Sequence, residues 1–269
     1  MDHNKDKEEV FAYWDEEACG TGFTHEEKYS EKYFEEVEAI RYNLEPYIHS
    51  FAQFDQYKNK KVLEVGVGAG TDFINWLRNG AVATGIDLTD VAIQNVEQRL
   101  KIEKLNAEKL EKADAENLPF DDNLFDLVYS WGVIHHSPDT IKALNEIVRV
   151  AKPGGEIKLM IYHRYSISAF WVWIRTCLLK GKFWKSITYA VANYVESPGT
   201  KAYTKTEARE LFLSMPVEIV SLKTVLTWCD LAETSRSNIV CLIHRALAWI
   251  GGGDRVGWFM LIKAIKKQV

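Results

Sequence analysis

A short apolar run that leads directly into a glycine-rich turn constrains this chain more than any other feature. The run VLEV is followed by GVGAGTD, which places glycines at positions 66, 68 and 70. Glycine lets a backbone turn tightly and approach a ligand where any Cβ would collide. The helix expected next would present its amino-terminal end, which favours negative groups, to the same place. The segment 62–72 therefore predicts a strand, a ligand-binding turn and a helix.

Two residues of this segment argue against a dinucleotide as the ligand. The dinucleotide-binding fingerprint needs a glycine at position 71, where this chain has Thr71. Glu64 lies inside the strand before the turn, and a carboxylate there is unsuited to a pyrophosphate. A carboxylate can instead receive a cationic amino group, directly or through water. We therefore expect a ligand with a cationic amino group and not a nicotinamide dinucleotide.

Short apolar runs alternate with amphipathic stretches over the middle of the chain. This alternation is typical of an α/β fold, in which a parallel sheet has helices on both faces and right-handed crossovers. The strands are expected at 61–65, 83–86, 127–129, 157–161, 217–222 and 258–264. The helices are expected near 71–79, 90–104 and 139–151. The segment 250–254, with three successive glycines, is expected to be a flexible turn between the last two strands.

The chain length of 269 residues fits a single domain of this class. Within it we expect a helical cap over residues 1–55, a cofactor-binding core over 56–163, an aromatic helical insertion over 164–206 and the rest of the sheet over 207–269. The cap and the insertion are the parts in which such folds build an acceptor pocket. The substrate contacts predicted there are Tyr29, Tyr33 and Arg41.

Composition and charge limit the partners of the chain. A net charge of −5 and an isoelectric point near 5.9 disfavour binding to nucleic acid. The four cysteines (Cys19, Cys177, Cys229 and Cys241) form no Cys-x-x-Cys pair, so we expect free thiols and no metal site. The amino terminus lacks the apolar segment of a signal peptide, and no run long enough to span a membrane occurs. A cytoplasmic protein is therefore expected.

Acidic side chains follow the second and third expected strands. Asp87 comes about 20 residues after the glycine turn, where an acid can accept hydrogen bonds from two ribose hydroxyls. The alternative role for Asp87, a helix cap, suits Thr89 or Asp90 better. Asp114 comes after an expected third strand, which lies between the runs at 83–86 and 127–129 and makes the run at 127–129 the fourth. Asp114 is expected at the same edge of the sheet. These positions predict a site for a nucleoside.

Six motifs stand in a fixed order between residues 60 and 165: E-V-G-x-G-x-G, G-I-D, D-A-E-x-L-P-F, F-D-L-V, H-H and P-G-G. At these spacings the set resembles class I S-adenosylmethionine-dependent methyltransferases, in the branch that acts on small molecules. The resemblance implies a Rossmann-like, doubly wound sheet of seven strands in the order 3-2-1-4-5-7-6, with the seventh strand antiparallel. It also implies S-adenosylmethionine as the cofactor and S-adenosylhomocysteine as the product.

The resemblance further assigns residues to the methionine and ribose parts of the cofactor. Glu64 and the backbone of the turn would hold the methionine moiety, and Asp87 would bind the ribose hydroxyls. The glycines of the turn that would take part are Gly66, Gly68 and Gly70.

Other residues are assigned to the adenine and the sulfonium. Asp114 would accept the exocyclic amine of the adenine, and Leu88 and Ala115 would flank the ring. Ser130 and Trp131, just past the fourth strand, would lie on the sulfonium side.

Two adjacent histidines, His135 and His136, follow the fourth strand and are the candidate catalytic residues. Their side chains must point in different directions, so at most one is expected to reach the transferred methyl group. A histidine can take a proton from an amine, a phenol or a thiol as that group is methylated. A purely structural role, packing at the start of the next helix, fits the sequence equally well.

The expected reaction is an in-line displacement in which an N, O, S or C nucleophile of a small molecule takes the methyl group. Three alternatives remain open: a non-catalytic protein that binds an adenosyl ligand, a methyltransferase of RNA or protein, and a lipid or quinone methyltransferase at a membrane surface. The last rests on the aromatic and basic stretch 170–194, which is otherwise an amphipathic lid over the pocket. The acceptor and the oligomeric state are left undetermined.

Overall fold

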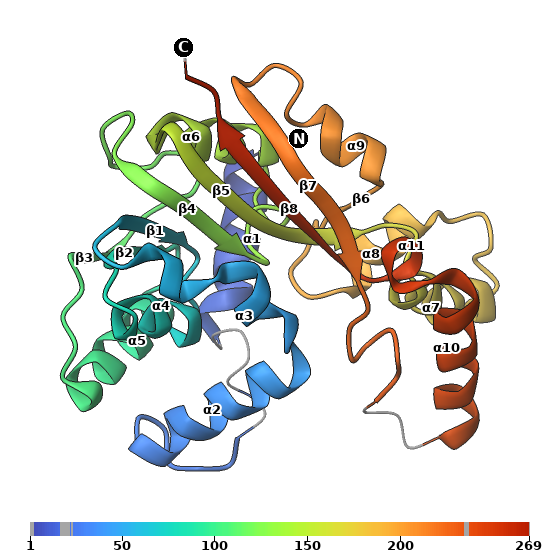
Figure 1. Ribbon diagram of the computed structural model, residues 1–269. Helices are drawn as coiled ribbons and strands as arrows, with labels where there is room; N and C mark the ends of the chain where they lie inside the picture. The colour runs from blue at the N-terminus through green and yellow to red at the C-terminus, as the bar shows by residue number, and fades with distance from the viewer. Residues whose placement is uncertain (1–2, 17–21, 23, 234–236, 269) are drawn as a thin grey trace.

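The computed structural model describes residues 3–16, 22, 24–233 and 237–268 of the chain. Its centre is a twisted sheet that separates two groups of helices (Figure 1). The strands are β1 (Lys61–Val65), β2 (Val82–Asp87), β3 (Lys109–Lys112), β4 (Phe125–Trp131), β5 (Ala151–His163), β6 (Ala202–Tyr203), β7 (Val217–Val225) and β8 (Phe259–Lys266).

The order of strands in the sheet is β3-β2-β1-β4-β5-β8-β7. Strands β1 to β5 pair in parallel, and β8 lies antiparallel between β5 and β7. If β7 and β8 are counted as the sixth and seventh strands, the predicted order 3-2-1-4-5-7-6 and the antiparallel seventh strand are confirmed. The two-residue strand β6, which pairs in parallel with the end of β5, was not predicted.

The helices before and within the first half of the sheet are α1 (His3–Glu16), α2 (Glu31–Leu44), α3 (Tyr47–Ala52), the 3-10 helix η1 (Phe54–Tyr57), α4 (Thr71–Arg78), α5 (Asp90–Glu103) and α6 (Thr140–Val150). Those after β5 are α7 (Ile167–Thr176), the 3-10 helix η2 (Leu178–Lys180), α8 (Ile187–Tyr194), α9 (Lys205–Glu210), α10 (Asn238–Gly251) and α11 (Gly253–Val256). None of the helices in the described ranges is long and apolar enough to cross a bilayer.

Two clusters of buried side chains lie on opposite faces of the sheet, because successive residues of a strand point to opposite sides. Val62 belongs to the cluster that holds Phe73 and Trp76 of α4, whereas Leu63 belongs to the cluster that holds Leu144 of α6. Polar side chains cap two of the helices on these faces: Thr89 accepts a hydrogen bond from the third residue of α5, and Asp139 accepts one from the third residue of α6. The apolar runs that predicted the strands are thus the central part of the core.

The segment predicted as a flexible turn at 250–254 is mostly helical, and that prediction is wrong. Gly251 is the last residue of α10 and Gly253 is the first of α11, so only Gly252, with φ 74°, turns the chain. Gly251 is needed for packing: a Cβ there would lie 2.6 Å from Cγ1 of Val256. The helix α10 itself was not predicted.

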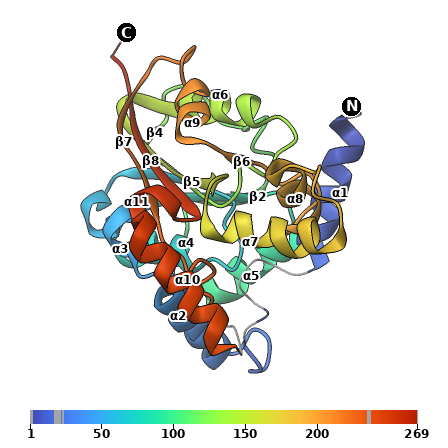
Figure 2. The same ribbon diagram turned by 90° about the vertical axis from the view of Figure 1, so that its right-hand side faces the viewer.

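A buried carboxylate, that of Asp230, joins the elements at the end of the sheet that carries α7 and α10 (Figure 2). Its Oδ1 accepts hydrogen bonds from the backbone N (3.0 Å) and Oγ (2.7 Å) of Ser168 in α7. Its Oδ2 accepts from the backbone N of Thr227 (2.9 Å) and of Trp258 (2.7 Å). The backbone O of Asp230 lies 2.9 Å from Nδ1 of His244 in α10. One residue therefore fixes two helices to the start of β8.

We expect Asp230→Ala to lower the free energy of unfolding by about 3 kcal/mol, because it leaves several buried donors without an acceptor. Urea denaturation followed by circular dichroism measures this difference. The matched control is Asp121→Ala, an exposed acid for which we expect a change within about 0.5 kcal/mol. Equal midpoints for the two variants would contradict the role given to Asp230.

Candidate active site

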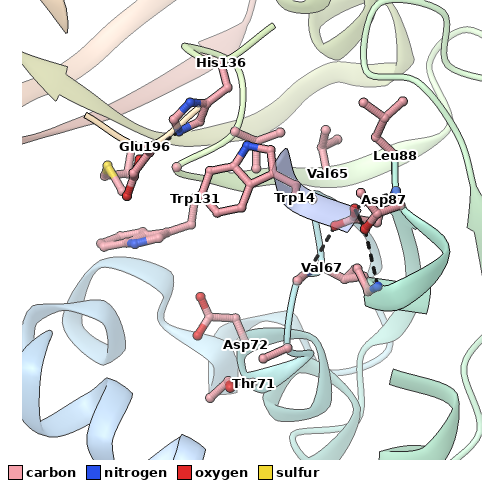
Figure 3. A pocket seen from close by; sticks show the side chains of 18 of the residues that line it. Trp14, Val65, Val67, Thr71, Asp72, Asp87, Leu88, Trp131, His136 and Glu196 are labelled. Atoms are coloured by element: carbon pink, nitrogen blue, oxygen red, sulfur yellow. Dashed lines mark hydrogen bonds and ion pairs between the residues drawn. The ribbon is translucent and has the colours of Figure 1, made fainter. Parts of the chain in front are cut away.

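A cavity of about 1150 Å³ lies at the carboxyl ends of the first four strands. Open α/β sheets bind ligands at this edge, where the strand order reverses between β1 and β4. Residues that follow β1, β2, β3 and β4 form its floor, and α1 and α2 cover it. Figure 3 shows Asp87 and Leu88 at one end of the cavity and His136 and Glu196 at the other. Its volume exceeds the ~300–1,000 Å³ of ordinary small-molecule pockets, so it has room for two ligands.

The turn after β1 brings its backbone to the floor of the cavity. Gly66 has φ 84°, and a Cβ there would lie 2.1 Å from Cγ2 of Val133. Gly68 has φ 51°, and nothing lies within 4 Å of the place that its Cβ would take. Gly66 and Gly68 line the cavity, whereas Gly70 does not; it packs against Val96 of α5. The open space before Gly68 is a cradle for a ligand that touches the backbone.

Asp87 is held in place by the loops on either side of it. Its Oδ2 accepts a hydrogen bond from the backbone N of Gly68 (3.0 Å), and its Oδ1 accepts from the backbone N and Oγ1 of Thr89 (both 3.0 Å). Burial raises the pKa of Asp87, and these hydrogen bonds oppose that rise. A carboxylate has about four acceptor positions, so Asp87 can still accept from a ligand hydroxyl. Leu88 lies beside it in the cavity wall.

The next part of the wall, after β3, is closed by the first helix. Asp114 and Ala115 line the cavity, as does Lys7 of α1. The Nζ of Lys7 lies 2.6 Å from Oδ2 of Asp114 and 2.8 Å from Oε2 of Glu116. A ligand amine that binds Asp114 must therefore share this carboxylate with Lys7 or displace it.

Buried charges lie under the opposite side of the turn. Oδ2 of Asp72 accepts hydrogen bonds from Nη2 of Arg41 (2.9 Å) and from the hydroxyl of Tyr129 (2.8 Å). Glu64 accepts a hydrogen bond from Nε1 of Trp76 (2.9 Å). Burial, and next the carboxylate of Asp72, raise the pKa of Glu64 well above its ordinary value. A cation bound in the cavity near Glu64 would favour the ionised carboxylate.

The two histidines are separated by the fold. His136 lines the cavity, but His135 is fully buried outside the lining, with its ring centroid 4.0 Å from that of Tyr162. Burial lowers the pKa of His135 well below its ordinary value, so its ring is neutral. Only His136 can therefore reach a ligand in the cavity directly.

Glu196 is a site residue that sequence reasoning missed. It follows α8, lines the cavity and exposes 32% of its side chain. Its Oε2 lies 3.2 Å from Nε2 of His136 and accepts a hydrogen bond from the hydroxyl of Tyr162 (2.7 Å). Burial acts to raise the pKa of Glu196, but His136 outweighs it and the pKa is lowered. The signal in the sequence is that Glu196 is the only acidic residue between Glu156 and Glu207.

The other nitrogen of His136 is also occupied. Its Nδ1 lies 2.9 Å from Oγ of Ser197 and 3.0 Å from Oγ1 of Thr200, both buried. Glu196 has φ 51°, in the left-handed region that non-glycine residues seldom adopt. Such backbone strain gathers at functional sites, where the surrounding contacts maintain it. Both residues of the pair line the cavity, but the two ring nitrogens of His136 lie against side-chain oxygens, whereas the contacts of the Glu196 carboxylate described above all involve Oε2.

Ligand atoms of His135, His136 and Glu196 all lie within 4.8 Å of one another. Histidine and glutamate are common zinc ligands. A zinc-binding measurement on these three residues therefore tests the expectation that the chain has no metal site. Cys229, which also lines the cavity, has its pKa raised to about 12 by burial. Its thiol therefore stays protonated and is not a base.

The remaining predicted residues lie in and near the cavity. Arg41 and Trp131 line it, whereas the buried Ser130 does not. Tyr29 and Tyr33 are also outside the lining: their rings pack on Phe34. Residues of the cavity wall to which the sequence assigned no role include Asp72, Trp228 and Cys229. Cys19 lies outside the described residues.

Part of the chain is similar in sequence to known methyltransferases. A family model described as a methyltransferase domain matches residues 63–159. The chain is similar to tocopherol O-methyltransferase of Arabidopsis thaliana, with 36% identity over 118 residues, which cover 43% of this chain and 34% of that protein. It is similar to the phthiotriol/phenolphthiotriol dimycocerosates methyltransferase of Mycobacterium tuberculosis, with 39% identity over 98 residues, which cover 36% of this chain and 35% of that protein. The chain thus spans about a third of the length of these relatives.

A solved structure agrees with the sheet described above. It is that of an S-adenosylmethionine-dependent methyltransferase from Aquifex aeolicus, which covers 85% of this chain and 97% of its own at 14% identity and a TM-score of 0.51. At this identity the similarity speaks for the fold alone. The chain therefore has the fold of class I S-adenosylmethionine-dependent methyltransferases, and residues 63–159, from β1 into β5, match a methyltransferase domain.

Proposed function

We propose that the chain transfers a methyl group from S-adenosylmethionine to a nucleophilic atom of a small molecule held in the same cavity. The observation that carries this proposal is the continuity of that cavity. It joins the glycine cradle and Asp87 at one end to the His136–Glu196 pair at the other. A cofactor bound at the first end and an acceptor at the second would face each other without leaving the protein.

The residues at the first end suit the cofactor. The cradle before Gly68 admits a group that touches the backbone, and Asp87 has an acceptor position left for a ribose hydroxyl. Asp114, Leu88 and Ala115 line the part of the wall expected to face the adenine. Glu64 suits the amino group of the methionine moiety. When bound, the cofactor supplies an electrophilic methyl group.

We assign Glu196 as the general base and His136 as a positioning residue. The lowered pKa of Glu196 keeps its carboxylate ionised but makes it a weaker base than an ordinary glutamate. It can accept a hydrogen bond from an acceptor hydroxyl or amine, and it can take the proton once methylation makes that group strongly acidic. His136 and the hydroxyl of Tyr162 hold Oε2, which leaves the other oxygen for the acceptor. By their names, the two relatives described above methylate tocopherol and phthiotriol or phenolphthiotriol dimycocerosates. The cavity wall of this chain includes Trp131, Trp258 and Phe259, which can pack against the apolar part of an acceptor.

The alternatives make different demands. A non-catalytic protein that binds an adenosyl ligand needs the first end of the cavity but has no use for an ionised carboxylate at the second. A methyltransferase of RNA would need a basic surface around the cavity mouth, against which the net charge of −5 argues. The acceptor atom, N, O, S or C, is a matter for experiment.

Cofactor binding is expected to depend on Asp87. In isothermal titration with S-adenosylmethionine and S-adenosylhomocysteine, we expect Asp87→Ala to weaken binding at least about tenfold, because the ribose loses its charged acceptor. The control is Asp90→Ala, an exposed acid at the start of α5 that does not line the cavity. Absence of binding to the unaltered protein would refute the proposed function and leave only the fold.

The second prediction concerns the base. A panel of phenols and amines is screened for release of S-adenosylhomocysteine, and the best acceptor is then used with Glu196→Gln. We expect turnover to fall by about 10²–10³-fold, in the range for a lost general base, while cofactor binding is unchanged. His136→Asn should lower turnover less and alter its pH profile, because it acts through Glu196. Full turnover by Glu196→Gln, matching the exposed control Glu210→Gln, would remove Glu196 from the mechanism.

A further inference from the structure

The described residues expose seventeen large hydrophobic side chains, and eleven of them lie in two segments, 170–184 and 239–250. Trp249 in α10 is 87% exposed, and Leu179 and Trp184 after α7 are 74% and 69% exposed. Exposed apolar surface gathered in this way marks a site of interaction. We name these eleven residues the apolar face: Phe170, Leu178, Leu179, Phe183, Trp184, Ile239, Leu242, Ile243, Leu247, Trp249 and Ile250.

The two segments are neighbours in space. The ring of Trp171 in α7 lies 5.1 Å from that of His244 in α10. Figures 1 and 2 both place α7 and α10 together at one end of the molecule. The apolar face is therefore carried by elements that are neighbours in the fold.

Helix α10 has apolar residues on opposite sides. His244 and Ala248, one turn apart, are buried against the protein. Ile239, Leu242 and Ile250 fall on the other side by helical spacing, and all three are exposed. A helix that is apolar all round is normally buried on every side. Within the part of the chain that the structure describes, only one side of α10 is covered.

The charge around the apolar face points to its partner. No Asp or Glu occurs from residue 166 to 195 or from 237 to 253, although the whole chain carries a net charge of −5. The same two stretches contain five basic residues: Arg175, Lys180, Lys182, Lys185 and Arg245. Two copies of the face would bring like charges together in a symmetric dimer. An anionic lipid surface is complementary to both the charge and the apolar side chains.

We propose that the apolar face docks on the surface of an anionic lipid bilayer. Aromatic and aliphatic side chains would enter the interface between headgroups and acyl chains, and the lysines and arginines would contact the headgroup charges. This mode of binding needs no membrane-spanning helix.

The helices that carry the apolar face are bonded to a segment of the cavity wall. Trp228 and Cys229 line the cavity, and the next residue, Asp230, bonds to α7 and contacts α10. Glu196 also lines the cavity and comes two residues after the end of α8. Resting on the proposed function, we infer that the methyl acceptor is an amphiphile that enters this end of the cavity from the bilayer.

Vesicle co-sedimentation of the full chain tests the proposal. We expect the protein to pellet with vesicles of phosphatidylcholine mixed with phosphatidylglycerol, less with phosphatidylcholine alone, and less in high salt. Leu242→Glu combined with Trp249→Glu should weaken binding by roughly tenfold or more, because each places a charge in the apolar interface. The matched control is Leu213→Glu combined with Val220→Glu, two exposed apolar residues far from the face in sequence, and we expect no change.

Further measurements on the same variants distinguish the possible reasons for a loss of vesicle binding. Circular dichroism confirms that each is folded, and titration with S-adenosylmethionine, which we expect to be unchanged, keeps a failure of docking distinct from a failure of the cofactor site. An unaltered protein that stays in the supernatant with anionic vesicles overturns the proposal. Sedimentation velocity without lipid tests whether a second copy of the chain binds the apolar face instead. A dimer that Trp249→Glu abolishes, together with no vesicle binding, would overturn the proposal and assign the face to that second copy.

Discussion

The cavity depends on the close approach of three backbone segments around the glycine turn after β1. Gly66 comes so near to the loop after β4 that a Cβ would overlap Val133, and the backbone N of Gly68 donates to Asp87 at the end of β2. A bulkier turn would push these loops apart. The same positive-φ backbone that closes the floor also leaves the space before Gly68 open. Close packing on one side and an open cradle on the other are two results of one sequence feature.

Hydrogen bonds offset the unfavourable free energy of burying charged groups under the turn. Asp72 receives hydrogen bonds from Arg41 and from the hydroxyls of Tyr42 and Tyr129. A buried ion pair is tolerated when its geometry is good and its other atoms are hydrogen-bonded. Glu64 lies near this group with one weaker partner, the indole of Trp76. The polar group most dependent on a ligand cation is therefore Glu64, which faces the cavity.

The sequence predicted the sheet well because its signals are local, and most of the residues that it assigned to the cofactor lie in one cavity, Gly70 and Ser130 excepted. Their roles toward the cofactor stay predictions. Apolar runs mark the strands, and the residues that follow them come to one edge in a parallel sheet. The residues at the acceptor end of the cavity were harder to predict from the sequence. Glu196 meets His136 only because α8 and the turn after it return to β5, and Lys7 meets Asp114 across 107 residues. No local pattern encodes such contacts. Helix α10 was not predicted because its sequence is apolar on all sides and lacks the polar face by which a surface helix is recognised in a sequence.

That lack of a polar face is informative in itself. The side of α10 that packs on the protein is explained by the fold, whereas the opposite side is explained by nothing in the described chain. Asp230 fixes the packed side of α10 to the rest of the fold. Its carboxylate holds α7 and the start of β8, while its backbone O contacts α10. Asp230 directly follows Trp228 and Cys229, which line the cavity wall. The proposed lipid contact and the proposed entry of the acceptor would thus involve elements that Asp230 joins, at the end of the cavity away from Asp87.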